Sequence, residues 1–189
     1  MEIYFVTSNK NKLKEAEQIL GIKLKAVNLD LDEIQELDSD KIAEHKVKQA
    51  WKLIKKPLVV WDQSLYIHCL NGFPGPLIKW FWEKVGLEKI CQIANFFNDR
   101  RIYTKTTLTY YDGREIKHFY GIVHGTIPEK PRGKNGFAWD PIFIPKGHNK
   151  TFAEMTPEEK NSISMHKIAL EKLRNYLKNH TNLKFKTNP

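Results

Sequence analysis

The sequence predicts an α/β domain built on a mixed sheet, because strand and helix patterns alternate along it and one clear hairpin interrupts them. A short apolar run at residues 3–7 leads into two helix-capping residues, Ser8 and Asn9. Two runs rich in β-branched and aromatic residues, 103–111 and 115–123, flank an Asp-Gly turn. This order favours helices packed on a sheet with both parallel and antiparallel neighbours.

Apolar periodicity places the elements of the first half. The first helix runs to about residue 20, and its apolar face comprises Leu13, Ala16, Ile19 and Leu20. A second helix begins at the cap pair Asp38 and Ser39 and ends before Pro57. Its apolar face comprises Ile42, Val47, Ala50, Trp51 and Ile54. A short buried strand at 58–61 then ends at Asp62.

The remaining elements are shorter. A second strand is predicted at 65–70, a rigid Gly/Pro loop at 72–76, and helices at 77–85 and 87–96. After the hairpin, a last short strand is predicted at 142–144. The final helix begins between 161 and 164 and runs to about 177. The whole chain, 1–189, is predicted to be one domain, with a frayed tail over about 179–189.

Composition excludes several classes of protein. A chain of 189 residues with 41% hydrophobic residues can bury a core, and no apolar run is long enough to predict a membrane span. Two isolated cysteines, Cys69 and Cys91, argue against a disulfide framework and favour a cytoplasmic setting. The net charge of +9 permits a nucleic-acid partner, but a small polyanionic substrate explains a basic cleft equally well.

The start of the first helix is a candidate phosphate site. Free backbone N–H groups at a helix start attract anions, and Thr7, Ser8, Asn9 and Lys12 add donors and a positive charge. The spaced glycines of a P-loop are missing, so an ordinary capped surface helix is the alternative.

Two acidic residues are candidate ligands of a hard cation. Asp62 follows a buried strand, where sites in open α/β sheets gather, and Glu33 lies in a loop after a probable strand. Mg²⁺ prefers one or two carboxylates together with water and phosphate oxygens. Asp30 and Asp32 in the same loop read as solvated acids.

The segment 133–141 carries a candidate pocket for a nucleobase. If it is extended, Phe137 and Trp139 point to the same face and form an apolar wall, and Asp140 offers acceptors at its edge. The alternative is that both aromatic residues belong to the core beside a turn aspartate.

Other polar and aromatic residues are weaker candidates. Lys160 could reach a phosphate and His166 could enter a pocket, although both also fit a solvated helix start. His68 and Cys69 are predicted to be core residues. The same packing role is predicted for Trp51, Trp80 and Trp82.

The order of these motifs resembles that of the inosine triphosphate pyrophosphatase family, enzymes that clear nonstandard purine nucleotides. The resemblance covers about residues 2–178. The motifs are the Thr7-Ser8-Asn9 start with Lys12, Asp32-Glu33-Ile34-Gln35, Asp62, Gly72-Phe73-Pro74-Gly75 with Lys79-Trp80-Phe81, Gly136-Phe137-Ala138-Trp139-Asp140-Pro141, Thr151-Phe152-Ala153-Glu154-Met155 and Glu159-Lys160-Asn161.

The resemblance implies an elongated two-lobed α/β fold around a long mixed sheet, a cleft between the lobes, and a homodimer. It implies Mg²⁺-dependent attack of water on the α-phosphorus of a nucleoside triphosphate, with Mn²⁺ as a possible substitute. Asn9, Lys12 and Lys160 would hold the triphosphate, with Thr7 and Ser8 beside them. Glu33 and Asp62 would bind the metal, and Asp62 would orient or deprotonate the water. The resemblance assigns base binding to Phe137, Trp139 and Asp140, with Met165 and His166 at the positions of the family's purine-edge residues.

Two departures from the family pattern fall in the implied pocket. The family usually has two consecutive acids where this chain has Trp61 and Asp62. It usually reads Ser-His-Arg where, aligned without a gap, Ser164 is followed by Met165 and His166, and neither residue replaces an arginine fork. The alternative alignment inserts one residue and restores Ser-His-Lys, with His166 and Lys167. We therefore expect hydrolysis to be retained and base specificity to be altered.

Three other functions compete with this reading. One is a nucleotide-binding protein that no longer hydrolyses, for which Trp61 is the main support. Another is a pyrophosphatase for a different nucleotide, including modified pyrimidines. The third is a nucleic-acid-binding protein, which is disfavoured because the aromatic residues group with Asp140 and do not follow a basic stripe.

Overall fold

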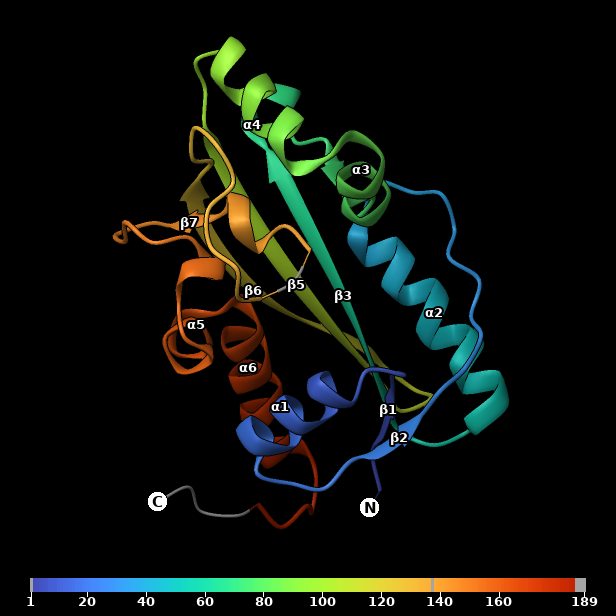
Figure 1. Ribbon diagram of the computed structural model, residues 1–189. Helices are drawn as coiled ribbons and strands as arrows, with labels where there is room; N and C mark the ends of the chain where they lie inside the picture. Colours follow the sequence, from blue (N-terminus) through green and yellow to red (C-terminus); the bar gives the residue numbers. More distant parts are fainter. Residues whose placement is uncertain (1, 137, 186–189) are drawn as a thin grey trace. The chain divides into compact units, whose positions relative to one another are not determined.

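The computed structural model describes residues 2–136 and 138–185. It confirms the predicted α/β class, with a seven-stranded sheet in the order β2-β1-β3-β5-β6-β7 and β4 paired to β3 (Figure 1). The strands are β1 (Tyr4–Val6), β2 (Lys25–Val27), β3 (Leu58–Ile67), β4 (Pro74–Gly75), β5 (Arg101–Tyr111), β6 (Ile116–Thr126) and β7 (Ile144–Pro145). The sheet is mixed, because β1 pairs in parallel with β2 and β3, whereas β3 pairs antiparallel with β4.

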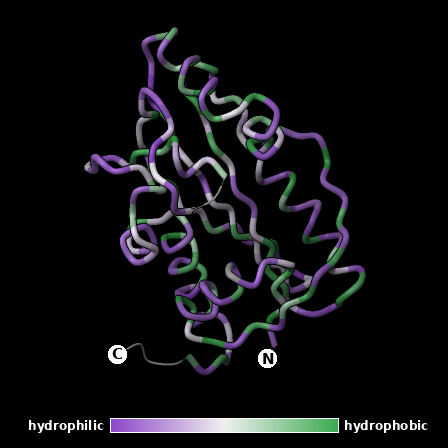
Figure 2. Tube along the Cα trace, viewed as in Figure 1, coloured by the Kyte–Doolittle hydropathy of each residue, from purple (hydrophilic) through white to green (hydrophobic). Residues whose placement is uncertain are grey.

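The helices lie close to their predicted positions. They are α1 (Lys10–Leu20), α2 (Ser39–Ile54), α3 (Ile78–Val85), α4 (Leu87–Phe96), α5 (Pro157–Ile163) and α6 (Met165–His180). Three short 3₁₀ turns complete the set, η1 (His68–Leu70), η2 (Asp140–Ile142) and η3 (Phe152–Glu154). Hydrophobic and hydrophilic residues alternate along α2, as expected for a helix with one buried face (Figure 2). None of the helices in the described part of the chain is long and apolar enough for a membrane span.

The chain divides into two compact units that share β3, β5 and β6. Unit 1 comprises Met1–Asp62, Thr106–Gly121 and His166–Pro189, and unit 2 comprises Gln63–Lys105 and Ile122–Met165. Each unit has hydrophobic clusters of its own, two in unit 1 and one in unit 2.

Unit 1 buries both faces of the first half of β3. Val59 and Trp61 face a cluster with α1 and α6, whereas Leu58 and Val60 face a cluster with α2. This alternation follows from the two-residue period of a strand. Asp62, two positions after Val60, therefore points to the α2 side, which decides its neighbours.

Unit 2 packs α3 and α4 with the turns after β6. Its core combines Leu65 and Ile67 of β3 with residues of both helices and of the 139–165 segment. The buried residues of that last segment are Trp139, Ile142, Phe143, Phe152, Met155 and Met165.

Several predicted boundaries were wrong. The two strands predicted at 58–61 and 65–70 are one strand, β3, which continues through Asp62 and ends at Ile67. The strand neighbours β5 in the sheet and pairs with β1 near its start and with β4 near its end, so sheet pairing overrides the polar side chains at 62–64. The strand predicted at 142–144 is broken, because Ile142 ends the 3₁₀ turn η2, which Pro141 favours, and the two-residue strand β7 begins only at Ile144.

The cluster around Lys160 belongs to a separate helix. Thr156 and Glu159 form a capping box that starts α5, and Ser164 is extended, with φ −71° and ψ 150°, which ends it before α6 begins. The sequence prediction placed this cluster at the start of the final helix and did not include α5 as a helix of its own.

Two core predictions in unit 2 also failed. The His68 side chain is exposed and contacts Asp99, whose carboxylate also pairs with Arg101 at 2.8 Å. These hydrogen bonds, led by that of Arg101, hold the pKa of Asp99 well below its usual range. Trp80 is 59% exposed, because α3 covers unit 2 with Ile78 and leaves Trp80 outward.

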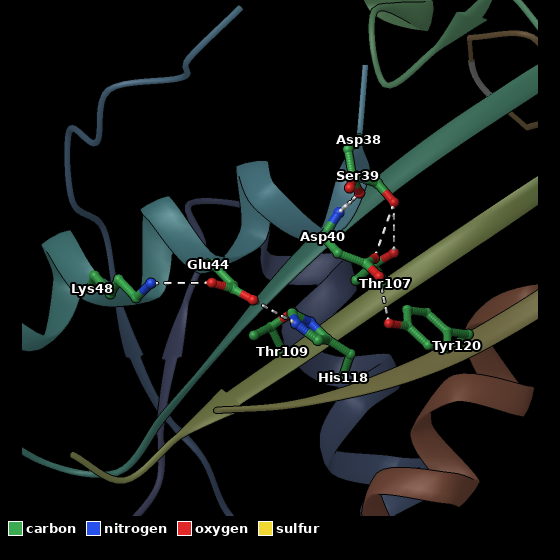
Figure 3. A network of polar contacts seen from close by, with 9 residues as sticks. All are labelled: Asp38, Ser39, Asp40, Glu44, Lys48, Thr107, Thr109, His118 and Tyr120. Carbon is green, nitrogen blue, oxygen red and sulfur yellow. Dashed lines mark hydrogen bonds and ion pairs between the residues drawn. The ribbon is translucent and has the colours of Figure 1, made fainter. Parts of the chain in front are cut away.

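A polar network fixes α2 against the β5–β6 hairpin (Figure 3). The Tyr120 hydroxyl donates to the Asp40 carboxylate at 2.6 Å, and buried Ser39 lies 3.5 Å from Thr107 Oγ1. Burial raises the pKa of Tyr120, and the hydrogen bond to Asp40 raises it further. The network therefore anchors the first half of α2 on this hairpin.

We expect Tyr120→Phe to lower the free energy of unfolding by about 1.5–3 kcal/mol, because Asp40 loses a hydrogen bond to a charged acceptor. Urea denaturation at pH 7 measures this change. Tyr111→Phe is the matched control, because Tyr111 is also a half-buried tyrosine of unit 1 and packs on Trp51 of α2. Equal stability of the Tyr120→Phe variant and the wild type would contradict the role of this network.

Candidate functional site

The start of α1 is organised by side-chain caps. The backbone N–H of Asn9 donates to Thr7 Oγ1 at 3.0 Å, and the N–H of Lys12 donates to Asn9 Oδ1 at 3.2 Å. The chain leaves β1 at Val6 and enters the helix at Lys10, so the intervening turn is held tightly. Three of the four predicted phosphate-binding residues at this end therefore have a defined local geometry.

A cavity of about 330 Å³ opens beside this turn in unit 1. Its lining includes Thr7, Ser8, Asn9, Lys12, Glu33, Lys46 and Trp61. The volume lies at the lower end of the ~300–1,000 Å³ range of small-molecule sites. The structure thus brings together the predicted phosphate-binding residues at α1 and one predicted metal ligand, Glu33.

Lys46 joins the two predicted metal ligands. Its Nζ lies 2.6 Å from Glu33 Oε1 and also contacts Asp62 Oδ1. Burial alone would depress the pKa of Lys46, but the charges and hydrogen bonds of Asp62 and Glu33 raise it overall. Glu33 and Asp62 therefore converge on one cationic group.

Sequence reasoning missed Lys46. The signal was a lysine one position before Val47 and three after Ala43, which are both fully buried on the sheet-facing side of α2. A lysine flanking a buried face can send its ammonium over the edge of the sheet toward an acid. The second part of this signal, that Asp62 points toward α2, required the continuous register of β3.

The loop that carries Glu33 is tied to α2 by Gln49. The Gln49 amide accepts from the Asp32 N–H at 3.1 Å and donates to the Asp32 carbonyl at 3.0 Å. Gln49 follows Lys46 by three positions, so both side chains emerge from the same side of the helix. The same helix face thus fixes the loop and binds its carboxylate.

Asp62 has one committed oxygen and one uncommitted oxygen. Oδ1 contacts Lys46, whereas Oδ2 is buried and has no hydrogen-bond partner among the described residues. An acceptor in this state costs folding free energy unless a further group uses it. Oδ2 is therefore available to a water molecule or a cation.

Two carboxylates that converge on one ammonium have the donor set that Mg²⁺ prefers, one or two carboxylates with the remaining positions left to water and phosphate. The described residues contain no group of three or more His, Cys, Asp or Glu side chains that could enclose a metal. A cation at Glu33 and Asp62 would therefore depend on oxygens of a ligand.

Lys12 and His166 complete the polar part of unit 1 around Trp61. Lys12 Nζ lies 5.2 Å from the Trp61 ring centroid, and the His166 ring lies 4.6 Å from it. Burial lowers the pKa of Lys12, the charge of Asp62 opposes that effect, and Lys46 adds to it. His166 is buried, and its Nδ1 lies 3.5 Å from Glu15 Oε1.

Two of the predicted site residues in unit 2, Asp140 and Lys160, form a buried ion pair. Lys160 Nζ lies 2.6 Å from Asp140 Oδ2, with both side chains nearly inaccessible. A Cβ added at Gly136 would lie 2.2 Å from Asp140 Oδ2, so only glycine fits there. Two residues assigned to different ends of a nucleotide are thus direct partners, and their substrate-binding roles stay predictions.

The extended conformation predicted for the aromatic segment was wrong. Gly136 and Ala138 have φ of +77° and +53°, so the chain turns and enters η2 at Asp140. Trp139 is 4% exposed and packs on Phe143, with 5.5 Å between the ring centroids. This agrees with the alternative prediction that Trp139 belongs to the core. Phe137 lies outside the described residues.

Met165 is also a core residue. Its side chain is fully buried in the cluster of unit 2, whereas the next residue, His166, belongs to unit 1. A buried thioether cannot contact a base edge without repacking, and the base-binding role of Met165 stays a prediction. His166 lies against Trp61, which the prediction of a base-edge role did not foresee.

Unit 2 has a larger cavity of about 970 Å³, to which none of the predicted site residues contributes. Arg101, His124, Lys146 and His148 line it, without a carboxylate. It therefore lacks the carboxylate–lysine arrangement found in unit 1.

Comparison with known proteins gives consistent matches along the whole chain. A model of the Ham1 family matches residues 3–176. The dITP/XTP pyrophosphatase of Saccharolobus solfataricus is 39% identical over 184 residues, which cover 96% of this chain and 96% of that protein. The inosine triphosphate pyrophosphatase of Schizosaccharomyces pombe is 40% identical over 184 residues, or 95% of this chain and 97% of that protein.

A solved structure shows the same fold. The HAM1 protein from Coxiella burnetii superposes with a TM-score of 0.85 at 28% sequence identity. The match covers 95% of this chain and 99% of that chain.

Proposed function

Because this chain belongs to the Ham1 family, we propose that it is a nucleoside triphosphate pyrophosphohydrolase that clears nonstandard nucleotides. The products would be the nucleoside monophosphate and pyrophosphate. The observation that carries the proposal is the arrangement in unit 1, where Lys12, Lys46, Glu33 and the α1 start line one cavity and Asp62 contacts Lys46.

The chain's own residues would divide the work. The N–H groups at the start of α1 and the Lys12 ammonium would bind phosphate oxygens and neutralise the charge of the departing pyrophosphate. Asp62 Oδ2 would accept a proton from the attacking water, since Oδ1 is already held by Lys46. Glu33 and Asp62 would hold Mg²⁺, which when bound polarises the phosphoryl oxygens and activates water.

A metal at Glu33 and Asp62 also explains why these carboxylates converge on a lysine. In the free protein the single positive charge of Lys46 offsets one of their two negative charges. We propose that a metal-bound triphosphate brings enough oxygen ligands to complete the coordination.

We also propose that the protein is a cytoplasmic homodimer. Phe73 and Trp80, which are 42% and 59% exposed on unit 2, support an interface on that unit. Light scattering coupled to size-exclusion chromatography tests the dimer, and a monomer at micromolar concentration would contradict it.

We expect the protein not to select ITP and XTP strongly. Ser164 is followed directly by Met165 and His166, without an arginine, and the His166 ring contacts Trp61 and Glu15. Loss of hydrogen-bond donors at a base edge relaxes discrimination by about 10²-fold or more. Pyrophosphate release measured across ITP, XTP, dITP, the standard triphosphates and triphosphates with modified purines or pyrimidines gives the ratios of kcat/KM.

A preference for ITP and XTP of more than about 10³-fold over ATP and GTP would contradict the altered specificity. Tight binding with no pyrophosphate release from any triphosphate, with either Mg²⁺ or Mn²⁺, would instead identify a nucleotide-binding protein without turnover.

A further inference from the structure

Lys12 has an unusual partner for a half-buried lysine. Its ammonium has no hydrogen bond or ion pair with any residue that the structure describes, and its close contact is the Trp61 ring at 5.2 Å. The charged groups that face it are Asp62 of β3, Glu15 of its own helix, Glu33 of the loop, and Lys46 of α2. An indole face attracts a cation most strongly where water is excluded.

Trp61 is held so that this face cannot turn away. It is 7% exposed and makes edge-to-face contacts with the rings of Phe5, at 6.1 Å, and His166, at 4.6 Å. Glu15 Oε1 lies 3.5 Å from His166 Nδ1, and the two form an ion pair when the imidazole is protonated. The indole therefore occupies one orientation.

The indole also carries a cost that a simpler apolar residue would avoid. Trp61 Nε1 is buried and has no hydrogen-bond partner among the described residues. A leucine or phenylalanine would pack against Phe5 and Leu20 without an unpaired donor.

We propose that Trp61 is a positioning residue whose indole face holds the Lys12 ammonium toward the cavity, with the rings of Phe5 and His166 packed against the indole. The consequence for catalysis rests on the proposed function, because Lys12 would be placed for the phosphate chain before the nucleotide arrives. Preorganisation of this kind lowers the cost of ordering a flexible side chain on binding.

The test replaces all five tryptophans by analogues with increasing fluorine substitution, which weakens the cation–π attraction while keeping the ring's shape. The probe is inorganic tripolyphosphate, and its Kd is measured by calorimetry in EDTA. We expect Kd to rise stepwise with fluorination, by roughly three- to thirty-fold over the series.

Two backgrounds isolate the contact. In Lys12→Met and in Trp61→Phe, fluorination should leave Kd unchanged, because one member of the pair is gone. A flat series in the wild type, a slope that persists in Lys12→Met, or no tripolyphosphate binding at all would overturn the inference. A stepwise series in a protein that hydrolyses no triphosphate would leave the inference standing and refute the proposed function.

Discussion

Asp62→Asn is expected to reduce kcat for pyrophosphate release by roughly 10²- to 10⁴-fold, the usual range for removing a general base. Asparagine keeps an oxygen for Lys46 but cannot take a proton at the position of Oδ2. KM should change much less, because the cavity-lining cation Lys12 and the α1 start remain. Steady-state kinetics at saturating Mg²⁺ separate the two parameters.

Asp30→Asn is the matched control for this variant. Asp30 lines the cavity of unit 1, and its replacement by asparagine removes one negative charge, as Asp62→Asn does. Asp30 is not a partner of Lys46. We expect less than about a fivefold change in kcat, the scale of one partly screened charge. If both variants lose activity equally, the effect is general electrostatics and Asp62 is not the base. If Asp62→Asn stays within a fewfold of wild type, its proposed role is wrong.

Lys46→Met should have two opposite effects. It removes the cation between Glu33 and Asp62, so divalent ions should bind the nucleotide-free protein at least about tenfold more tightly. The kcat should fall by roughly 10- to 100-fold, because Asp62 loses the group that orients it. Titration with Mn²⁺, followed by electron paramagnetic resonance, measures the binding without any turnover.

Stability gives a second measurement on the same variant. In EDTA we expect Lys46→Met to lose about 1–3 kcal/mol of unfolding free energy, because Asp62 is left as a largely buried, unpaired carboxylate. Saturating Mn²⁺ should restore most of this loss, since an ion that binds only the folded state stabilises it.

Lys48→Met provides the control for Lys46. Lys48 lies on the same helix, pairs with Glu44 at 3.1 Å and is 57% exposed, so its removal should change neither Mn²⁺ affinity nor kcat. If Mn²⁺ affinity is the same in Lys46→Met and the wild type, the two carboxylates are not the metal site.

Local sequence was sufficient for the elements that depend on local physics. Asp38 caps α2 as predicted, with its side chain accepting from the Asp40 N–H. The Asp112-Gly113 turn joins β5 to β6, with both strands near their predicted limits. The order of motifs also identified the family, and the matches over nearly the whole chain confirm it.

The candidate site was only half visible in this way. Thr7, Asn9, Lys12 and Glu33 meet at one cavity as the motifs implied. Lys46 was not predicted as a site residue, because a single lysine on an amphipathic helix usually lies on its solvent-exposed face. The apolar character of Trp139 and Met165 fits a base pocket and a core equally well, and both side chains lie in the core of unit 2.

Residue patterns are enough to predict the fold class, the family, and the residue types available for phosphate and metal chemistry. Which side chains become partners depends on the three-dimensional arrangement: Lys46 with Glu33 and Asp62, Lys160 with Asp140, and Trp61 with Lys12 and His166. This difference comes from strand register. Local patterns fix whether a segment is helix or strand, but a strand's continuity through residues 62–64 sets which face each side chain takes, and so which charges it meets.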